Sequence, residues 1–272
     1  MKKEFIHIFI VVVAAMCLYS CSPDNNIETK TYQFNQKYYL TQDTTKGILT
    51  VDIRVELPEK YLDKTILMSV RNDIVEKSFG KDYIQYSNNK ILSRYASDMA
   101  EEYKDNNLPF FKSEDPDEIG FAYNNDYILE IFSLLNNEHF FSYGLDLYVY
   151  MGGAHGVNNR LYYNYDLRNG RLISEEDLFW GDYKPFLTEL IKQQIVDYNA
   201  EINSIEDLNN IYWTEYIKPN GNFYITDDAI NYVFNQYEIA PYAYGHTEVS
   251  IPFAKIKDIL KENTPIECLL QK

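Results

Sequence analysis

A short segment of this chain, Met151-Gly152-Gly153-Ala154-His155-Gly156, has residue types that could carry chemistry. The glycines let the backbone take positive φ or approach another group closely, and His155 is the only functional side chain among them. Its imidazole could serve as a base, a ligand of a metal or a contact to a bound molecule. Alternatively, the ring bridges backbone groups across a tight corner. We favour a structural or recognition role, because no serine or cysteine nucleophile is adjacent and neither GxSxG nor HExxH is present.

A second candidate is the loop at residues 235–245, which is aromatic on both sides of a proline and ends in a glycine. Tyrosine combines a large rigid ring with a polar hydroxyl and is common at recognition surfaces. The loop is therefore either a contact surface or a plug over the end of the hydrophobic core, and both interpretations stay open. Its candidate contact residues are Tyr237, Glu238, Pro241, Tyr242 and Tyr244.

The histidines and carboxylates do not predict a metal site or a hydrolase. A zinc site needs three or four converging ligands, whereas His139, His155 and His246 are widely spaced and form no HxH or HxxxH pair. We therefore expect no metal and no cofactor. Paired acids could serve a glycosidase, but two of the three pairs fall at predicted helix or turn positions, where acids are common anyway. The pairs are Glu101-Glu102, Glu175-Glu176 and Asp227-Asp228.

The first twenty residues are typical of a targeting signal. Two lysines precede a mostly apolar run at 5–18, which is shorter than the ~20 residues that a membrane-spanning helix needs. The run ends in Leu-Tyr-Ser-Cys, which resembles a bacterial lipoprotein cleavage box. We expect a signal peptide at 1–20, a lipidated Cys21, a flexible tether at 21–30 and attachment to a membrane through this lipid. The alternative is an ordinary secretory signal followed by a chance cysteine.

The composition limits the partners. A formal net charge of −16 argues against nucleic acid and against direct attraction to anionic lipid, and it favours a cationic protein or peptide partner. Of the three cysteines, Cys268 would remain after signal removal and lipidation, so no intrachain disulfide is expected. The 26 tyrosines are explained either by composition drift and core packing or by a binding face.

The periodicities predict an α+β fold made of two small antiparallel-sheet subdomains with helices packed on one face. Strict alternation at 47–58 predicts a strand that ends at Pro58, and 127–135 and 140–150 read as two further strands. Apolar residues at helical spacing predict helices between the first of these strands and the others. We divide the chain into an N-terminal α+β domain at 31–150 and a C-terminal α+β domain at 151–272.

Five motifs in a fixed order resemble the RsiV/PdaC-type extracytoplasmic domain, a family of largely unknown function. The resemblance covers most of the chain after the predicted signal, although the motifs before residue 150 are weaker. The motifs are GGAHG at 152–156, YNYDLRNG at 163–170, EEDLF at 175–179, FYITDDAI at 223–230 and YEIAPYAYG at 237–245.

This resemblance implies an α+β fold without a cofactor, in a family whose best-understood member binds lysozyme. Together with the signal, it predicts a non-catalytic, lipid-anchored protein of the cell envelope, at the outer membrane on its periplasmic or surface face. Its expected partner is a lysozyme-like protein or a peptidoglycan glycan. The alternative is an envelope hydrolase that acts on cell-wall glycan with His155 and an acidic partner supplied by the fold.

Overall fold

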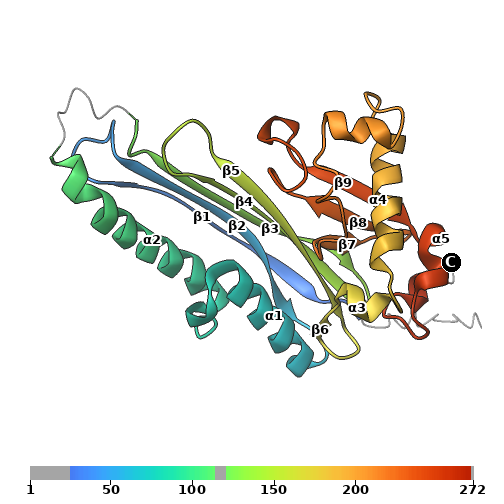
Figure 1. The fold of residues 1–272 in the computed structure, drawn as a ribbon. Coiled ribbons are helices and arrows are strands. Elements are labelled where there is room, and N and C mark those ends of the chain that lie inside the picture. Colours follow the sequence, from blue (N-terminus) through green and yellow to red (C-terminus); the bar gives the residue numbers. More distant parts are fainter. Residues whose placement is uncertain (1–24, 114–120, 271–272) are drawn as a thin grey trace, which may run out of the picture.

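The computed structural model describes residues 25–113 and 121–270, which form two sheets with helices (Figure 1). The larger sheet has six strands in the order β1-β2-β3-β4-β5-β6, and the smaller has three in the order β7-β8-β9. The predicted α+β class is confirmed. The strands of the large sheet are β1 (Glu28–Tyr39), β2 (Ile48–Lys60), β3 (Asn125–Asn136), β4 (Phe140–Tyr150), β5 (Val157–Asp166) and β6 (Arg171–Leu172).

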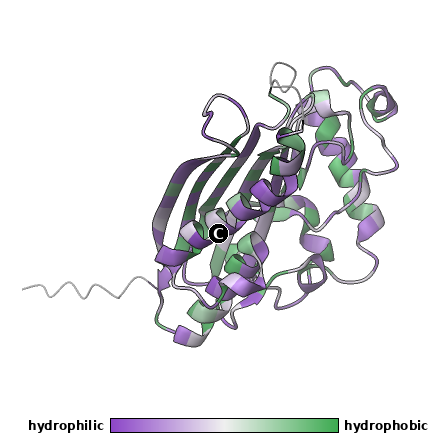
Figure 2. Ribbon diagram, turned by 90° about the vertical axis from the view of Figure 1, so that its left-hand side faces the viewer, coloured by the Kyte–Doolittle hydropathy of each residue, from purple (hydrophilic) through white to green (hydrophobic). Residues whose placement is uncertain are grey.

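Alternation along the strands decides which face of the large sheet is buried. Figure 2 shows hydrophilic and hydrophobic residues alternating along its long strands. In β2 the alternation places one row of apolar side chains in the core, as the sequence predicts. The row comprises Leu49, Val51, Ile53, Val55 and Leu57.

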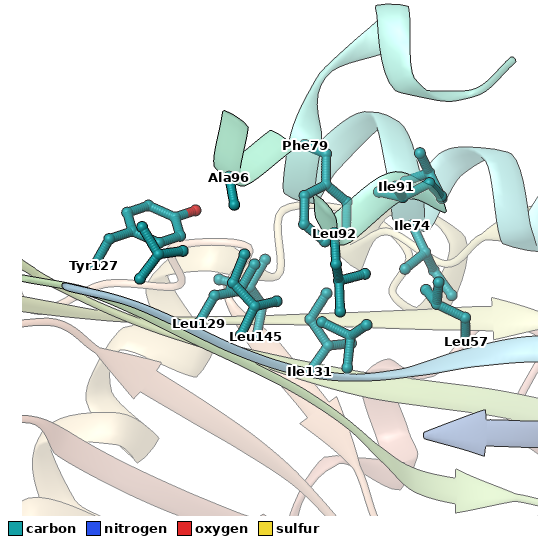
Figure 3. Close-up of a cluster of buried hydrophobic side chains, with 14 of the residues drawn as sticks. Leu57, Ile74, Phe79, Ile91, Leu92, Ala96, Tyr127, Leu129, Ile131 and Leu145 are labelled. Atoms are coloured by element: carbon teal, nitrogen blue, oxygen red, sulfur yellow. The ribbon is translucent and has the colours of Figure 1, made fainter. Parts of the chain in front are cut away.

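Two long helices, α1 (Lys64–Phe79) and α2 (Asn88–Phe111), cover this buried face (Figure 1). Helix α1 begins after Asp63, whose carboxylate accepts hydrogen bonds from two backbone N–H groups of the first turn. Figure 3 shows side chains of both helices, among them Ile74 and Leu92, pointing toward the apolar residues of the strands. The N-terminal half of the chain thus has one continuous hydrophobic core.

One strand pair departs from the antiparallel arrangement that the sequence predicts. Strands β2 and β3 are parallel, whereas the other neighbouring pairs of the large sheet are antiparallel. The reason is the connection: α1 and α2 lie between these two strands, and a chain that crosses over a sheet through helices returns in the same direction. Helix α2 continues through Asn106, Asn107 and Pro109 and ends at Phe111.

The C-terminal unit forms a second core on the opposite side of the large sheet from α1 and α2 (Figure 1). Helix α4 packs along the three-stranded sheet, and its buried side includes Leu187, Ile191 and Ile195. The elements are α3 (Glu175–Leu178), α4 (Lys184–Tyr198), β7 (Phe223–Ile225), β8 (Ala229–Phe234), β9 (Thr247–Pro252) and α5 (Phe253–Ile256). Short 3-10 turns complete the chain: η1 (Lys81–Tyr83), η2 (Glu206–Asn210), η3 (Tyr242–Tyr244), η4 (Lys257–Ile259) and η5 (Glu267–Leu269).

Strand β5 joins the two units. It pairs with β4 in the large sheet, so this sheet continues past the predicted domain junction at 150/151. The two hydrophobic clusters instead divide between Leu167 and Ile173, apart from Phe140, which packs in the second cluster. A division of the chain into two units therefore follows the cores better when it is placed after β5.

Amide side chains of the C-terminal unit accept hydrogen bonds from backbone N–H groups along the outer edge of β5. Asn222 accepts a hydrogen bond from the backbone N–H of Tyr162 at 3.0 Å, and Asn235 accepts one from that of Arg160 at 2.7 Å. Gln236 accepts a third from the N–H of Asn158 at 3.1 Å. An edge strand that would otherwise expose unpaired N–H groups is thus closed, and the segment after β8 is fixed beside the turn that precedes β5.

Asn164 makes the most buried of these connections. Its side-chain oxygen accepts from the Ser142 hydroxyl at 2.8 Å and from the Ile225 N–H at 3.1 Å, and its amide donates to the Phe223 carbonyl at 2.8 Å. Asn164 and Ser142 are both fully buried. This residue of the YNYDLRNG motif thus ties β4 and β5 of the large sheet to β7 of the small one.

Candidate binding surface

The two predicted segments, the turn at 151–156 and the loop at 235–245, come together in the structure. The turn connects β4 to β5, and the loop connects β8 to β9. The ring of His155 stacks on that of Tyr242, with centroids 4.0 Å apart and planes inclined by 22°. The Tyr242 hydroxyl donates a hydrogen bond to the Gly156 carbonyl at 3.1 Å. Residues that are distant in the sequence therefore form one surface.

The hydrogen bonds of His155 define its tautomer. Nδ1 lies 3.0 Å from the carbonyl oxygen of Gly156, and because a carbonyl only accepts, Nδ1 carries the proton. Nε2 is then free to accept from the hydroxyl of Tyr237, which lies 3.5 Å away. Among the described residues, no carboxylate lies within ion-pair distance of the His155 ring. The exposed imidazole is thus held by two tyrosines and a carbonyl.

Close approach explains two of the turn glycines. Gly152 has φ +83°, and a Cβ there would lie 2.4 Å from the carbonyl oxygen of Ala122. At Gly156 a Cβ would lie 2.5 Å from the ring of Tyr148. Gly153 has φ +95° with no atom within 4 Å of such a Cβ, so there the conformation alone favours glycine.

Tyr237 is presented by a strained turn. Its φ of +65° is uncommon for a bulky residue, and the residue is 52% exposed. The neighbouring Glu238 holds the turn: its carboxylate accepts from the Asn235 N–H and from the Asn220 side-chain amide, both at 2.7 Å. Glu238 therefore supports the position of Tyr237, in addition to lining the adjacent pocket.

The sequence analysis missed two aromatic residues that extend this surface. Trp213 and Tyr216 lie in an irregular segment after η2 and, with Glu215, Tyr237 and Glu238, line an open pocket of about 480 Å³. The Trp213 N–H donates to the Ile239 carbonyl at 2.8 Å, which fixes this segment to the loop. The scarcity of tryptophan, two in the chain, was the one available signal. We call Trp213, Tyr216, Tyr237, Tyr242 and His155 the aromatic surface.

The remaining predicted site residues lie apart from the pocket or outside the described residues. Pro241 is exposed and precedes η3, and the half-exposed Tyr244 has its ring centroid 6.5 Å from that of Tyr212. Cys21 lies outside the described residues. Within residues 25–113 and 121–270, no three His, Cys, Asp or Glu side chains are grouped to hold a metal ion. In the same ranges, no helix combines the length and apolar character needed to cross a membrane.

Glu175, in the EEDLF motif, is a buried carboxylate next to the core of the C-terminal unit. It accepts from the Gly221 N–H at 2.9 Å and from the Tyr183 hydroxyl at 3.3 Å. Burial raises the pKa of its carboxyl above the ordinary value, although these hydrogen bonds oppose the shift. The pKa of Glu175 is therefore higher in the folded than in the unfolded protein. The stability that protonation of this carboxyl contributes is present below the unfolded-state pKa, and it is lost as the pH rises through the folded-state pKa.

Glu175→Gln is therefore expected to raise the Tm at pH 7 and to have a smaller effect at pH 4, where the wild-type carboxyl is largely protonated. Thermal unfolding at the two pH values measures this difference. The matched control is the exposed Glu176, whose pKa is lowered by hydrogen bonds to its own backbone and to Tyr183. Glu176→Gln should lower the Tm at pH 7. An equal loss of Tm for Glu175→Gln at both pH values would contradict this account.

Residues 176–254 match a family described as "Protein of unknown function (DUF3298)". Two curated relatives come from Bacillus subtilis strain 168. The chain is 31% identical to the peptidoglycan-N-acetylmuramic acid deacetylase PdaC over 117 residues. These residues are 42% of this chain and 25% of PdaC. The chain is also 32% identical to the anti-sigma-V factor RsiV over 109 residues. This aligned part is 36% of each chain. The matched part thus spans about a quarter to about a third of these relatives.

Solved structures extend the likeness to most of the chain. A crystal structure of a DUF3298 family member from Bacteroides fragilis is 28% identical, has a TM-score of 0.86, and the match covers 92% of this chain and 100% of that one. A DUF3298 family protein from Pseudomonas aeruginosa shares the fold, at 16% identity and a TM-score of 0.55, over 87% of this chain and 96% of that one. The chain is therefore similar to DUF3298 proteins over most of its length, and the predicted resemblance to the domain family of RsiV and PdaC is confirmed.

Proposed function

We propose that this protein is a non-catalytic binding protein of the cell envelope, anchored through a lipid on Cys21, that recognises a peptidoglycan glycan through the aromatic surface. The observation that supports it most is the group of exposed rings around an open pocket, with Trp213 37% and Tyr216 55% exposed beside Tyr237. Rigid amphipathic rings offer contact area to a sugar at low entropic cost, and Glu215 adds a hydrogen-bond acceptor at the rim.

The backbone strain at Tyr237 also supports a binding role for the aromatic surface. Strained residues persist where the surrounding structure holds them, and they cluster at ligand-binding positions. Here Glu238 and Asn220 hold a turn whose effect is to expose a ring. The similarity to a deacetylase of peptidoglycan-N-acetylmuramic acid also favours a glycan of the cell wall as the ligand.

A lysozyme-like protein is the second candidate partner. The net charge of −16 favours association with a cationic protein. The chain is also similar to RsiV, and its resemblance to the RsiV/PdaC-type family implies lysozyme binding. The proposed surface would serve this partner as well, because tyrosine and tryptophan are enriched at protein interfaces. A hydrolase would need an acidic partner at His155, and no described contact of His155 favours that function.

Calorimetric titration with soluble peptidoglycan fragments tests the proposal. Tyr237→Asn removes the ring while keeping a residue type that tolerates positive φ, so the fold should be retained. Combined with Tyr216→Ala, it is expected to weaken glycan binding at least about tenfold, or about 1.4 kcal/mol. Tyr198→Ala is the control, because Tyr198 is 76% exposed at the end of α4 and does not line the pocket.

A parallel titration with c-type lysozyme, at low and moderate salt, separates the two partners. Saturable lysozyme binding that survives moderate salt, without glycan binding, would favour the second candidate. Glycan binding that is unchanged in the double variant would remove the aromatic surface from the account.

A further inference from the structure

A second pocket, of about 370 Å³, lies between α2 and the large sheet and is lined by none of the residues of the aromatic surface. Tyr127, at one end of the core residues labelled in Figure 3, contributes to its wall, and its hydroxyl lies 3.1 Å from that of Tyr95 on α2. The pocket is largely apolar. Its aliphatic and aromatic lining consists of Leu49, Met99, Tyr103, Tyr127, Val149, Tyr150 and Met151.

Two carboxylates line this pocket, Glu102 on α2 and Asp126 on β3. Among the described residues, neither forms an ion pair or a side-chain hydrogen bond. No lysine, arginine or histidine lines the pocket. An apolar wall beside uncompensated negative charge is complementary to a group with an aliphatic stem and a cationic head.

Met151 lines this pocket and is also exposed to solvent. Its side chain is 74% exposed, although it is apolar, and it follows directly after β4. Methionine adapts to partners of different shape and is common at binding surfaces. A lysine or arginine side chain could lay its methylene stem against Met99 and Met151 while its charge meets Glu102 and Asp126.

We propose that this pocket binds a basic side chain of an amphipathic polypeptide segment, with Glu102 and Asp126 pairing with the cation. The site goes beyond the glycan surface, because the two pockets share no residue. The acidic chain as a whole would speed the encounter with such a segment at low salt.

The test titrates the protein with an amphipathic peptide of leucine and lysine, and with a matched peptide in which glutamate replaces lysine. The lysine peptide is expected to bind, and Glu102→Gln combined with Asp126→Asn should raise its Kd about tenfold. Met151→Ala should raise the Kd about threefold. These changes are at exposed or half-buried positions, and thermal unfolding verifies that each variant remains folded.

The matched control is Glu101→Gln combined with Asp105→Asn, which removes the same charge from exposed positions of α2 that do not line the pocket. It should change the Kd less than twofold. An equal effect of the two double variants would show that net charge alone attracts the peptide and would overturn the proposal. The proposal would also fail if the lysine peptide did not bind, or if the glutamate peptide bound as tightly.

Discussion

Replacing Asn164 with alanine is expected to lower the free energy of unfolding by about 3 kcal/mol, because three buried groups lose their partner at once. These are the Ser142 hydroxyl, the Phe223 carbonyl and the Ile225 N–H. A buried polar group without a partner costs about 1–3 kcal/mol. For a chain of this size the loss corresponds to a fall in Tm of roughly 6–12 °C.

Thermal or denaturant unfolding measures this effect, and Asn159→Ala on the same strand is the control because Asn159 is exposed. The control should stay within about 0.5 kcal/mol of the wild type. Because Asn164 connects β5 to β7, we also expect the C-terminal unit to become more accessible to protease in Asn164→Ala. A loss below about 1 kcal/mol would show that the connection between the two sheets does not depend on this side chain.

The second large effect is expected at Gly152. Gly152→Ala forces a Cβ to within 2.4 Å of the Ala122 carbonyl oxygen in a backbone with φ +83°, so either the turn or the segment at Ala122 must move. We expect a loss of about 2–4 kcal/mol, from the left-handed strain and the clash together. Chemical denaturation followed by circular dichroism measures the change.

Gly153→Ala separates the two causes. Gly153 shares the positive φ, but a Cβ there would meet no atom within 4 Å. Its substitution should cost about 1–2 kcal/mol, which is the strain alone. Equal losses at the two positions would contradict the close approach at Gly152 and would leave conformation as the sole reason for both glycines.

The sequence predicted local structure well where period and turn chemistry act alone. The alternation of β2 and the strands predicted at 127–135 and 140–150 depend on near neighbours. Periodicity shows which side chains share a face but not which strand lies alongside, so the parallel pairing of β2 with β3 was not predicted. That pairing depends on how the intervening helices pack.

The candidate site shows the same limit. His155 and Tyr242 were each singled out, but their stacking depends on the edge of β5 being closed by amides from after β8. Trp213 lies in an irregular segment, where neither period nor turn motif marks a residue. It joins the surface through a backbone hydrogen bond to Ile239, which a sequence pattern does not reveal.

The fluorescence of Trp213 tests the central claim most directly. The chain has two tryptophans, and the exposed Trp180 lies apart from the aromatic surface, so Trp180→Phe leaves Trp213 as the single reporter. Titration of this variant with peptidoglycan fragments should give a saturable change in emission with the same Kd as calorimetry. Calorimetric binding without any change in Trp213 emission would contradict the claim that the glycan occupies the aromatic surface.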